Sequence, residues 1–177
     1  MSDRRQWVSV SAPYVSGQPG DAWAAEAAAQ GGAGTQKLVA VGEVPAPDLV
    51  ARLLGLEAGE PVVLRSRVML LDERPVELVD SYYPAAIAGD TLLAERRKVP
   101  GGAVSHLTQL GYPPRRAVED VTARLATQAE IEELGLAAPA CVLEIARVIL
   151  SDDDVPVEAT FMTSPADSRR LRYEVAL

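Results

Sequence analysis

Two arginines stand two residues apart in an apolar segment of an acidic chain. Arg65 and Arg67 interrupt the run VVLRSRVMLL at 62–71. This run is typical of a strand, in which residues i and i+2 point to the same face. The whole chain carries 17 Lys+Arg against 25 Asp+Glu, a net charge of -8. Because paired guanidinium groups bind carboxylates and phosphates through several hydrogen bonds, we expect this face to accept a small anion.

Other kinds of site find little support among the residue types. His106 is the single histidine and Cys141 the single cysteine, so a clustered histidine zinc site is excluded, and we expect neither a metal nor a cofactor. No phosphate-binding loop and no GxSxG nucleophile motif occurs. The negative net charge argues against direct nucleic-acid binding by this chain. No apolar stretch approaches the roughly 20 residues of a membrane span, and no signal-peptide pattern is present, so we expect a cytoplasmic protein.

The periodicity of the sequence predicts one α+β domain with a mainly antiparallel sheet. Strand-like segments lie at 37–44, 62–71, 75–84, 117–126, 141–150 and 155–163, and helical segments at 45–56, 105–112 and 129–136. We expect the helices on one face of the sheet, and Ser105 as the N-cap of its helix. Residues 1–36 are expected to form a peripheral strand and a flexible linker, which leaves 37–177 as the ligand-binding domain.

A helix-and-hairpin unit occurs twice, at 45–84 and 128–165. The segment LGLEAGEPVVLRSRVMLLDERPVELVDSYYP at 54–84 aligns with LGLAAPACVLEIARVILSDDDVPVEATFMTSP at 134–165, whose turn is one residue longer. Two copies of such a unit most simply join their strands into one antiparallel sheet.

The repeat also sorts the charged residues of the strands. Arg67 recurs as Arg147 and Glu77 as Glu158, which suggests an ion pair between arginine and glutamate within each hairpin. The counterpart of Arg65 is an isoleucine. Because shared positions are expected to serve the architecture, Arg65 is the stronger candidate for binding a ligand.

The order and spacing of these segments resemble the UTRA domain, the effector-sensing half of GntR-type transcription regulators of the HutC subfamily, which has a chorismate-lyase-like fold. The resemblance covers about residues 37–173. It is carried by the RxR strand, PVE after the turn, the closing YP, and then SHLTQL, EDVTARLATQAEIEELGL and VILSDDDVPVEATFM. Such regulators carry a winged helix-turn-helix domain ahead of this one. No segment here resembles it, so we expect DNA to be reached only through a separate N-terminal domain.

The resemblance implies a site for a small anionic effector, such as a sugar phosphate or a carboxylate. In that family the RxR arginines, here Arg65 and Arg67, and the loop leading into the SHLTQL-type helix bind the anionic part of the effector. Gly102 and Ser105 lie where that helix begins, and a helix N-terminus offers free N–H groups and a positive dipole end. The further candidates are strand residues: Glu77, Ser81, Tyr83, Glu158 and Thr160.

Alternatives remain open for several of these residues. Ser105 can simply cap its helix, Glu77 and Glu158 can be architectural, and Tyr83 can be a core aromatic. Because side chains alternate along a strand, Glu77 shares the face of the arginines only if the turn between the two strands has an odd number of residues, as a loop over 72–74 would. For the whole chain, the alternative to a homodimeric sensor is a chorismate-lyase-like enzyme acting on a small dicarboxylate. We expect the sensor, not an enzyme.

Overall fold

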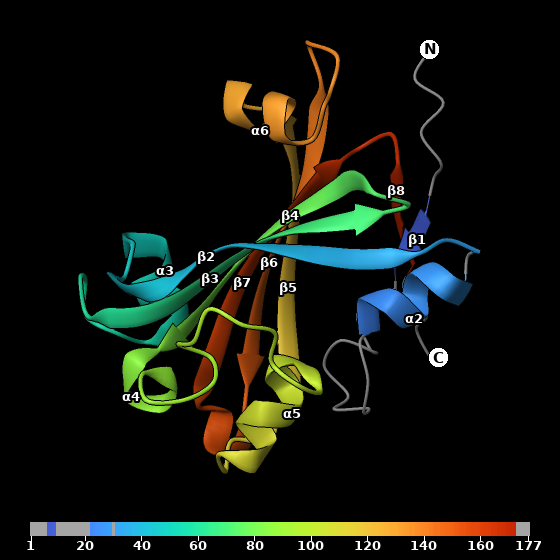
Figure 1. Cartoon of the computed structure of the whole chain (residues 1–177). Coiled ribbons are helices and arrows are strands. Elements are labelled where there is room, and N and C mark those ends of the chain that lie inside the picture. Colours follow the sequence, from blue (N-terminus) through green and yellow to red (C-terminus); the bar gives the residue numbers. More distant parts are fainter. Residues whose placement is uncertain (1–6, 10–21, 30, 173–177) are drawn as a thin grey trace, which may run out of the picture.

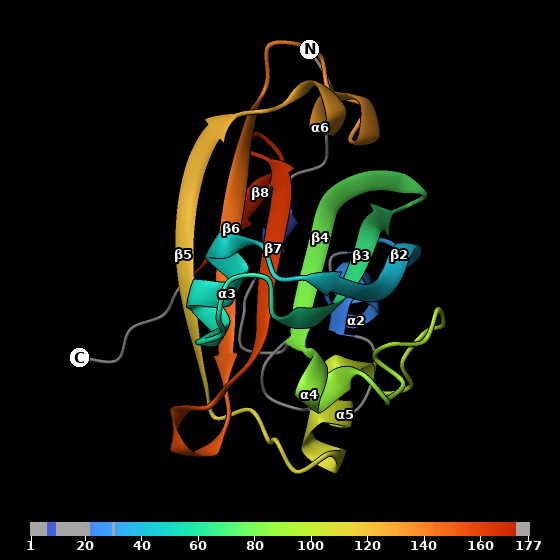
Figure 2. The same ribbon diagram turned by 90° about the vertical axis from the view of Figure 1, so that its left-hand side faces the viewer.

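The computed structural model describes residues 7–9, 22–29 and 31–172, and its centre is a six-stranded antiparallel sheet (Figures 1 and 2). The strand order is β2-β3-β4-β7-β6-β5. The bounds are β2 (Gly34–Pro45), β3 (Pro61–Leu71), β4 (Arg74–Pro84), β5 (Arg116–Leu125), β6 (Cys141–Leu150) and β7 (Pro156–Pro165). Two short strands, β1 (Trp7–Ser9) and β8 (Arg169–Leu171), pair in parallel beside it. The predicted α+β class with a mainly antiparallel sheet is confirmed.

The helices cover both faces of the sheet. We call the face that carries Arg65 and Arg67 the arginine face. Helices α2 (Ala22–Ala29), α4 (Ala85–Ala88) and α5 (Gly102–Gln109) contribute to apolar clusters on this face. Helix α6 (Gln128–Glu133) lies at the end of the sheet away from α4 and α5, and a 3-10 turn (Asp152–Asp154) joins β6 to β7 (Figure 1).

Helix α3 (Asp48–Leu54) packs on the opposite face, so the prediction that all helices share one face is wrong. Its buried residues Val50 and Leu54 lie in a cluster with Val62 and Ala159. These two strand residues alternate with those of the arginine face, so both sides of the sheet are partly apolar and each needs cover.

The β3–β4 turn decides which residues share the arginine face. Only Asp72 and Glu73 lie between the last paired residues, and both have positive φ, 49° and 65°, as a two-residue hairpin turn requires. An even turn alone would put Glu77 on the other face. An extra residue in β4, Val76, shifts the register between Leu70 and Met69 and corrects the parity. Glu77 therefore lies on the arginine face, and a bulge, not an odd loop, places it there.

The second hairpin carries its bulge at the equivalent position. Leu150 lies opposite Pro156 and Ile149 opposite Glu158, which leaves Val157 as the extra residue. The element order α3-β3-β4 therefore matches α6-β6-β7 down to the bulge. An internal duplication of the sequence stays a prediction.

The sequence suggested a flexible linker around a possible short helix at 21–30; helix α2 occupies that position, and it belongs to the core. Trp23 and Ala27 are 4% and 2% exposed. The Trp23 indole N–H donates to the carbonyls of Thr35 at 3.0 Å and Leu70 at 3.1 Å, which ties α2 to β2 and β3. The peripheral strand expected within 1–36 corresponds to β1, and the rest of that prediction at 1–6, 10–21 and 30 lies outside the described residues. In the part of the chain that is described, no helix has the length and apolar composition to cross a membrane.

Candidate functional site

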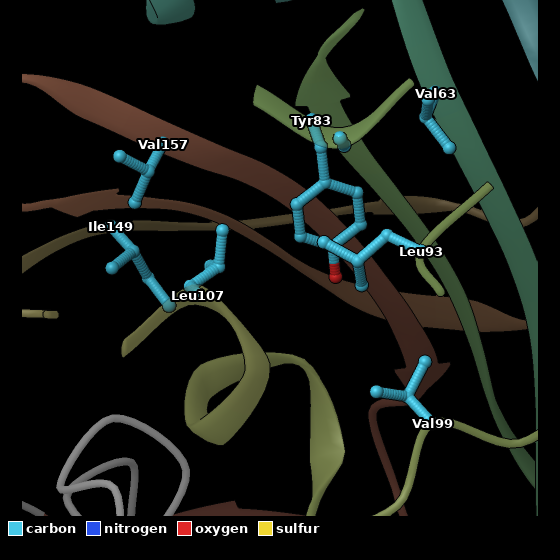
Figure 3. Close-up of a cluster of buried hydrophobic side chains, with 8 residues drawn as sticks. Val63, Tyr83, Leu93, Val99, Leu107, Ile149 and Val157 are labelled. Atoms are coloured by element: carbon cyan, nitrogen blue, oxygen red, sulfur yellow. The ribbon is translucent and has the colours of Figure 1, made fainter. Parts of the chain in front are cut away.

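A layer of polar side chains crosses the arginine face between two apolar clusters. One cluster lies around Trp23 and Met69, and the other around Tyr83 and Leu107 (Figure 3). On β3 the two arginines fall between Val63 of the second cluster and Met69 of the first. Strand register places the remaining members on the same face. We call the following set the polar layer: Arg65, Arg67, Ser81, Glu119, Arg147, Glu158 and Thr160.

A chain of hydrogen bonds runs through this layer across three adjacent strands. Arg67 Nη2 donates to Ser81 Oγ at 2.6 Å. The hydroxyls of Ser81 and Thr160 lie 2.8 Å apart, and Thr160 Oγ1 lies 2.6 Å from Glu158 Oε1. A guanidinium can only donate and a carboxylate only accept, so each hydroxyl must donate toward Glu158. The chain is therefore polarised, with hydrogen-bond donors at the Arg67 end and acceptors at the Glu158 end.

The positive charge of Arg67 has no carboxylate partner within the described structure, unlike that of its repeat counterpart. Arg147 and Glu119 face each other across β6 and β5 and form an ion pair at 2.6 Å, with side chains 7% and 10% exposed. The residue of β2 opposite Arg67 is Leu38. In addition, the Arg67 Nε is buried without a hydrogen-bond acceptor. A buried donor on an uncompensated cation costs free energy unless a ligand satisfies it.

Arg65 is buried at 5% exposure and is held by backbone carbonyls. Its Nη1 donates to Leu93 at 2.7 Å, Glu95 at 2.9 Å and Leu92 at 3.4 Å, and its Nη2 to Arg97 at 2.7 Å. Burial, reinforced by the charge of Arg67, lowers the pKa of Arg65. The repeat gave no reason to expect an architectural role for Arg65, but its hydrogen bonds fix the loop before α5. Its role as a ligand for an effector stays a prediction.

Tyr83 lies at the centre of the second apolar cluster, only 1% exposed (Figure 3). Burial and the charge of Glu158 raise the pKa of its phenol far above the usual value, and Arg67 and Arg65 only partly oppose this. The group is therefore protonated at neutral pH. Its position agrees with a core aromatic at the border of the polar layer, and its role as a ligand contact stays a prediction.

The ion pairs expected within each hairpin do not form. Glu77 pairs with Arg169 of β8, and Arg147 pairs with Glu119. The reason is register: Glu77 lies opposite Met69, two residues from the position facing Arg67. Glu77 shares the arginine face but lies beside the first apolar cluster, so it belongs to the anchorage of β8.

The start of α5 differs from the prediction. The helix begins at Gly102, with Gly101 before it, so Ser105 is not the N-cap. Gly101 and Gly102 both have positive φ, 75° and 83°, which lets the chain enter the helix earlier. No hydrogen bond in the described structure joins Gly102 or Ser105 to the arginines. Helix α5 reaches the border of the polar layer through Leu107, which packs in the same cluster as Tyr83.

Sequence reasoning missed Glu119 and the carbonyl groups around Arg65. Strand alternation locates the face of Glu119, but its partner follows only from the β5–β6 register. Loop carbonyls carry no residue-type information at all, because every residue has one. Among the described residues, no group of three or more His, Cys, Asp or Glu side chains is placed to hold a metal ion.

Comparison with known proteins agrees with this geometry. The profile of the UTRA domain matches residues 29–170. The chain belongs to the UTRA domain family. An uncharacterized HTH-type transcriptional regulator of Rhizobium meliloti (strain 1021), RB1450, is 31% identical over 139 residues, which is 78% of this chain and 56% of that protein. A second such regulator, SCO4628 of Streptomyces coelicolor, is 30% identical over 121 residues, covering 67% and 45% of the two chains. This UTRA domain thus spans about half the length of these relatives.

Solved structures with the same fold come from transcriptional regulators. The effector domain of PhnF from Mycobacterium smegmatis is 25% identical with a TM-score of 0.76, and the match covers 90% of this chain and 99% of that one. The C-terminal domain of a histidine utilization repressor from Pseudomonas syringae pv. tomato is also 25% identical, with a TM-score of 0.70 and coverage of 81% and 99%. The family expected from the sequence is confirmed as the UTRA domain of GntR-family regulators.

Proposed function

We propose that this UTRA domain senses a small organic anion that binds in the polar layer, as part of a GntR-type regulator of the HutC subfamily. The observation that carries the proposal is the uncompensated charge of Arg67 and Arg65. Arg147, Arg169 and Arg124 each have a glutamate partner. For Arg65 and Arg67 no carboxylate partner exists among the described residues, although they share one face. A buried cation without a counter-ion favours an anionic ligand.

The polarised hydrogen-bond chain supports a more specific ligand pattern. Free donors lie at Arg67, and acceptors lie at Glu158, two strands away. The links of 2.6, 2.8 and 2.6 Å hold Arg67 Nη2 and Glu158 Oε1 within about 8 Å of each other. A fitting ligand carries an anionic group at one end and a hydroxyl or ammonium donor at the other. Sugar phosphates and hydroxy or amino acids have this pattern.

In the full regulator, effector binding would change the DNA affinity of an N-terminal winged-helix domain in the cytoplasm, with the protein acting as a homodimer. The features that support association are the position of β5 at the edge of the described sheet and its exposed apolar side chains, Val118, Val121 and Leu125. Unpaired edge strands readily pair with a second chain. Sedimentation velocity of the isolated domain tests the dimer, and a monomer at all concentrations would contradict it.

Calorimetric titration with small acids and their neutral analogues tests the site. We expect a sugar phosphate to bind and the parent sugar to bind weakly or not at all. Arg67→Ala should remove the binding, whereas Arg52→Ala, which removes the same charge from an exposed position on α3, should retain it. Equal affinities of the two variants would contradict the site. Chemical turnover of a bound acid would favour the lyase alternative.

A further inference from the structure

The loop that precedes α5 lies across the arginine face and is fastened mainly by one side chain. We call residues 92–97 the strap. Leu93 is fully buried in the second apolar cluster, but residues 95–97 are exposed. The Arg65 guanidinium donates to carbonyls along the whole strap, at Leu92, Leu93, Glu95 and Arg97. The conformation of the strap therefore depends on Arg65.

The strap has one further link to the sheet. Arg96 Nη2 donates to the carbonyl of Val39 at 3.0 Å, at the point where a bulge interrupts the edge strand β2. The neighbouring ion pair of Arg97 and Glu95 is internal to the strap and exposed. Exposed links of this kind contribute little to stability. Release of Arg65 would leave Leu93 and Ala94 on one side and Val99 on the other packed in the second apolar cluster, with the exposed residues 95–97 loosened between them.

The carbonyls of the strap and a bound anion make opposing demands on Arg65. A carbonyl oxygen carries a partial negative charge, and carbonyls gathered around one guanidinium repel an anion that approaches it. A carboxylate or phosphate adds the attraction between two full opposite charges to the hydrogen bonds of a guanidinium, and a neutral carbonyl cannot supply this attraction. An anion that reaches Arg65 therefore displaces the carbonyls, and the nearby Arg67, which holds none of them, is the group that can capture the anion first.

We propose that the strap and an anionic effector compete for Arg65, so that anion binding releases residues 95–97. This inference rests on the proposed function and adds its regulation: occupancy of the polar layer is reported by the order of the strap. Arg65 is then the shared element of two exclusive states, one with the strap fastened and one with the anion bound.

Limited trypsin digestion tests the competition, because the strap and its junction offer the cleavage sites Arg96, Arg97 and Lys98. Cleavage after the exposed Arg115, outside the strap, serves as the internal reference. The full chain is digested with and without inorganic phosphate, at constant ionic strength, and phosphate binding is followed separately by 31P NMR line broadening. The variants are Arg65→Ala, Arg65→Lys and Arg67→Ala.

In the wild type, phosphate should accelerate strap cleavage relative to Arg115, by about fivefold for each hydrogen bond of ordinary strength that is lost. Arg65→Ala should be cleaved rapidly with or without phosphate, and Arg65→Lys, which keeps the charge but loses the fork of donors, should lie between the two. Arg67→Ala should keep a fastened strap that phosphate no longer opens. If Arg65→Ala unfolds, cleavage at Arg115 rises as well, and the lysine variant then decides.

The outcomes separate the two proposals. Phosphate that binds but leaves strap cleavage unchanged or slower overturns the competition and leaves the anion site standing. An Arg65→Lys strap as resistant as the wild type also overturns it. Absence of phosphate binding in the wild type overturns the anion site itself, and the competition with it.

Discussion

Replacing Leu38 by glutamate should weaken anion binding without harming the fold. Leu38 of β2 lies opposite Arg67 in the same way that Glu119 of β5 lies opposite Arg147. Leu38 is half-buried, so a glutamate there has room to reach solvent or the guanidinium. A carboxylate opposite Arg67 would form the ion pair that the other hairpin already contains, and it would occupy the charge on which the proposed ligand depends.

The magnitude follows from the geometry of the existing pair. Two unit charges ~4 Å apart interact by about 4 kcal/mol at an effective dielectric constant near 20. Partial exposure of position 38 and salt screening reduce this to about 1–2 kcal/mol. Loss of that attraction weakens anion binding by about 5- to 30-fold. Leu38→Gln has nearly the same shape without the charge, so it should bind phosphate as the wild type does.

Isothermal titration with inorganic phosphate measures the affinity, and urea denaturation measures the stability of the same samples. The glutamate variant should unfold at a urea concentration equal to or above that of the glutamine variant, because it gains an ion pair. Equal phosphate affinities for Leu38→Glu and Leu38→Gln, with both proteins folded, would show that Arg67 is not the charge that holds the anion.

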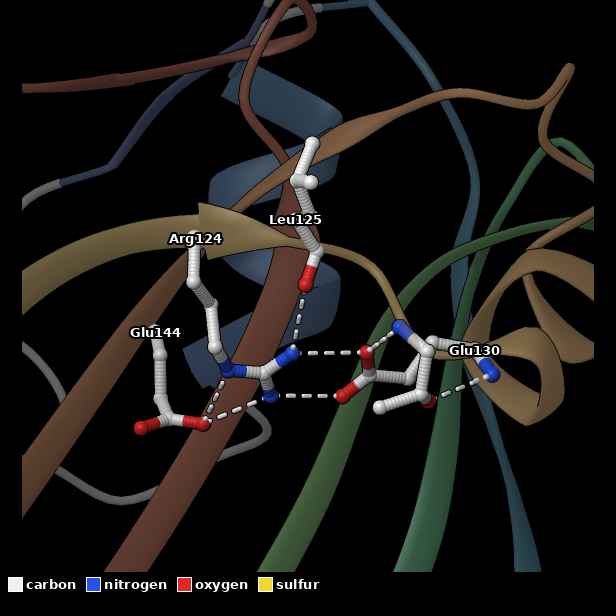
Figure 4. Close-up of polar contacts among 5 residues, drawn as sticks. Arg124, Leu125, Glu130 and Glu144 are labelled. Atoms are coloured by element: carbon white, nitrogen blue, oxygen red, sulfur yellow. Dashed lines mark hydrogen bonds and ion pairs between the residues drawn. The ribbon is translucent and has the colours of Figure 1, made fainter.

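Three further perturbations follow from the contacts. Arg124 donates to Glu130 at 2.7 Å and to Glu144 at 2.7 Å (Figure 4), and its hydrogen bonds lower the pKa of Glu130 to about 2. The folded state therefore has the full stabilisation from this ion pair above the ordinary glutamate pKa and loses it as pH falls toward 2. Glu130→Gln should make the free energy of unfolding, measured by urea titration, less dependent on pH in this range. At pH 7 the substitution should lower that free energy by about 1–2 kcal/mol after allowance for solvent screening. Trp23→Phe removes the indole donor from two carbonyls and should lower the free energy of unfolding by about 1–2 kcal/mol in the same assay, while leaving the phosphate affinity unchanged. Ser81→Ala, at a fully buried position, breaks the chain between Arg67 and Glu158 and should cost about 1–3 kcal/mol, so an unchanged urea midpoint would speak against the chain.

Much of the fold could be predicted because strands and helices leave periodic patterns. The alternation around Arg65 and Arg67 placed β3 correctly, and the family resemblance followed from segment order. The position of α3 could not be predicted in the same way, because a strand that is apolar on both faces does not say which face receives the next helix. The bulge at Val76 was also missed, since an extra residue in a strand leaves no mark on composition.

The residue types of the site could be predicted from the sequence, but the hydrogen-bond and ion-pair partners of these residues could not. Ser81, Glu158 and Thr160 were named as candidates and lie in one hydrogen-bonded chain. The partner of each charge depends on register, and a shift of two residues directed Glu77 to Arg169 instead of Arg67. Backbone carbonyls hold Arg65, and a search among side chains does not find them.

The polar layer lies between two apolar clusters that contribute separately to the packing of the same sheet face. Each cluster thus stabilises its own end of the domain. The polar layer between them can therefore accept substitutions among hydroxyl, amide and charged residues at a small cost in folding free energy. Domains built this way can change their ligand specificity by a few substitutions in the polar layer, while the two apolar clusters and the sheet remain unchanged.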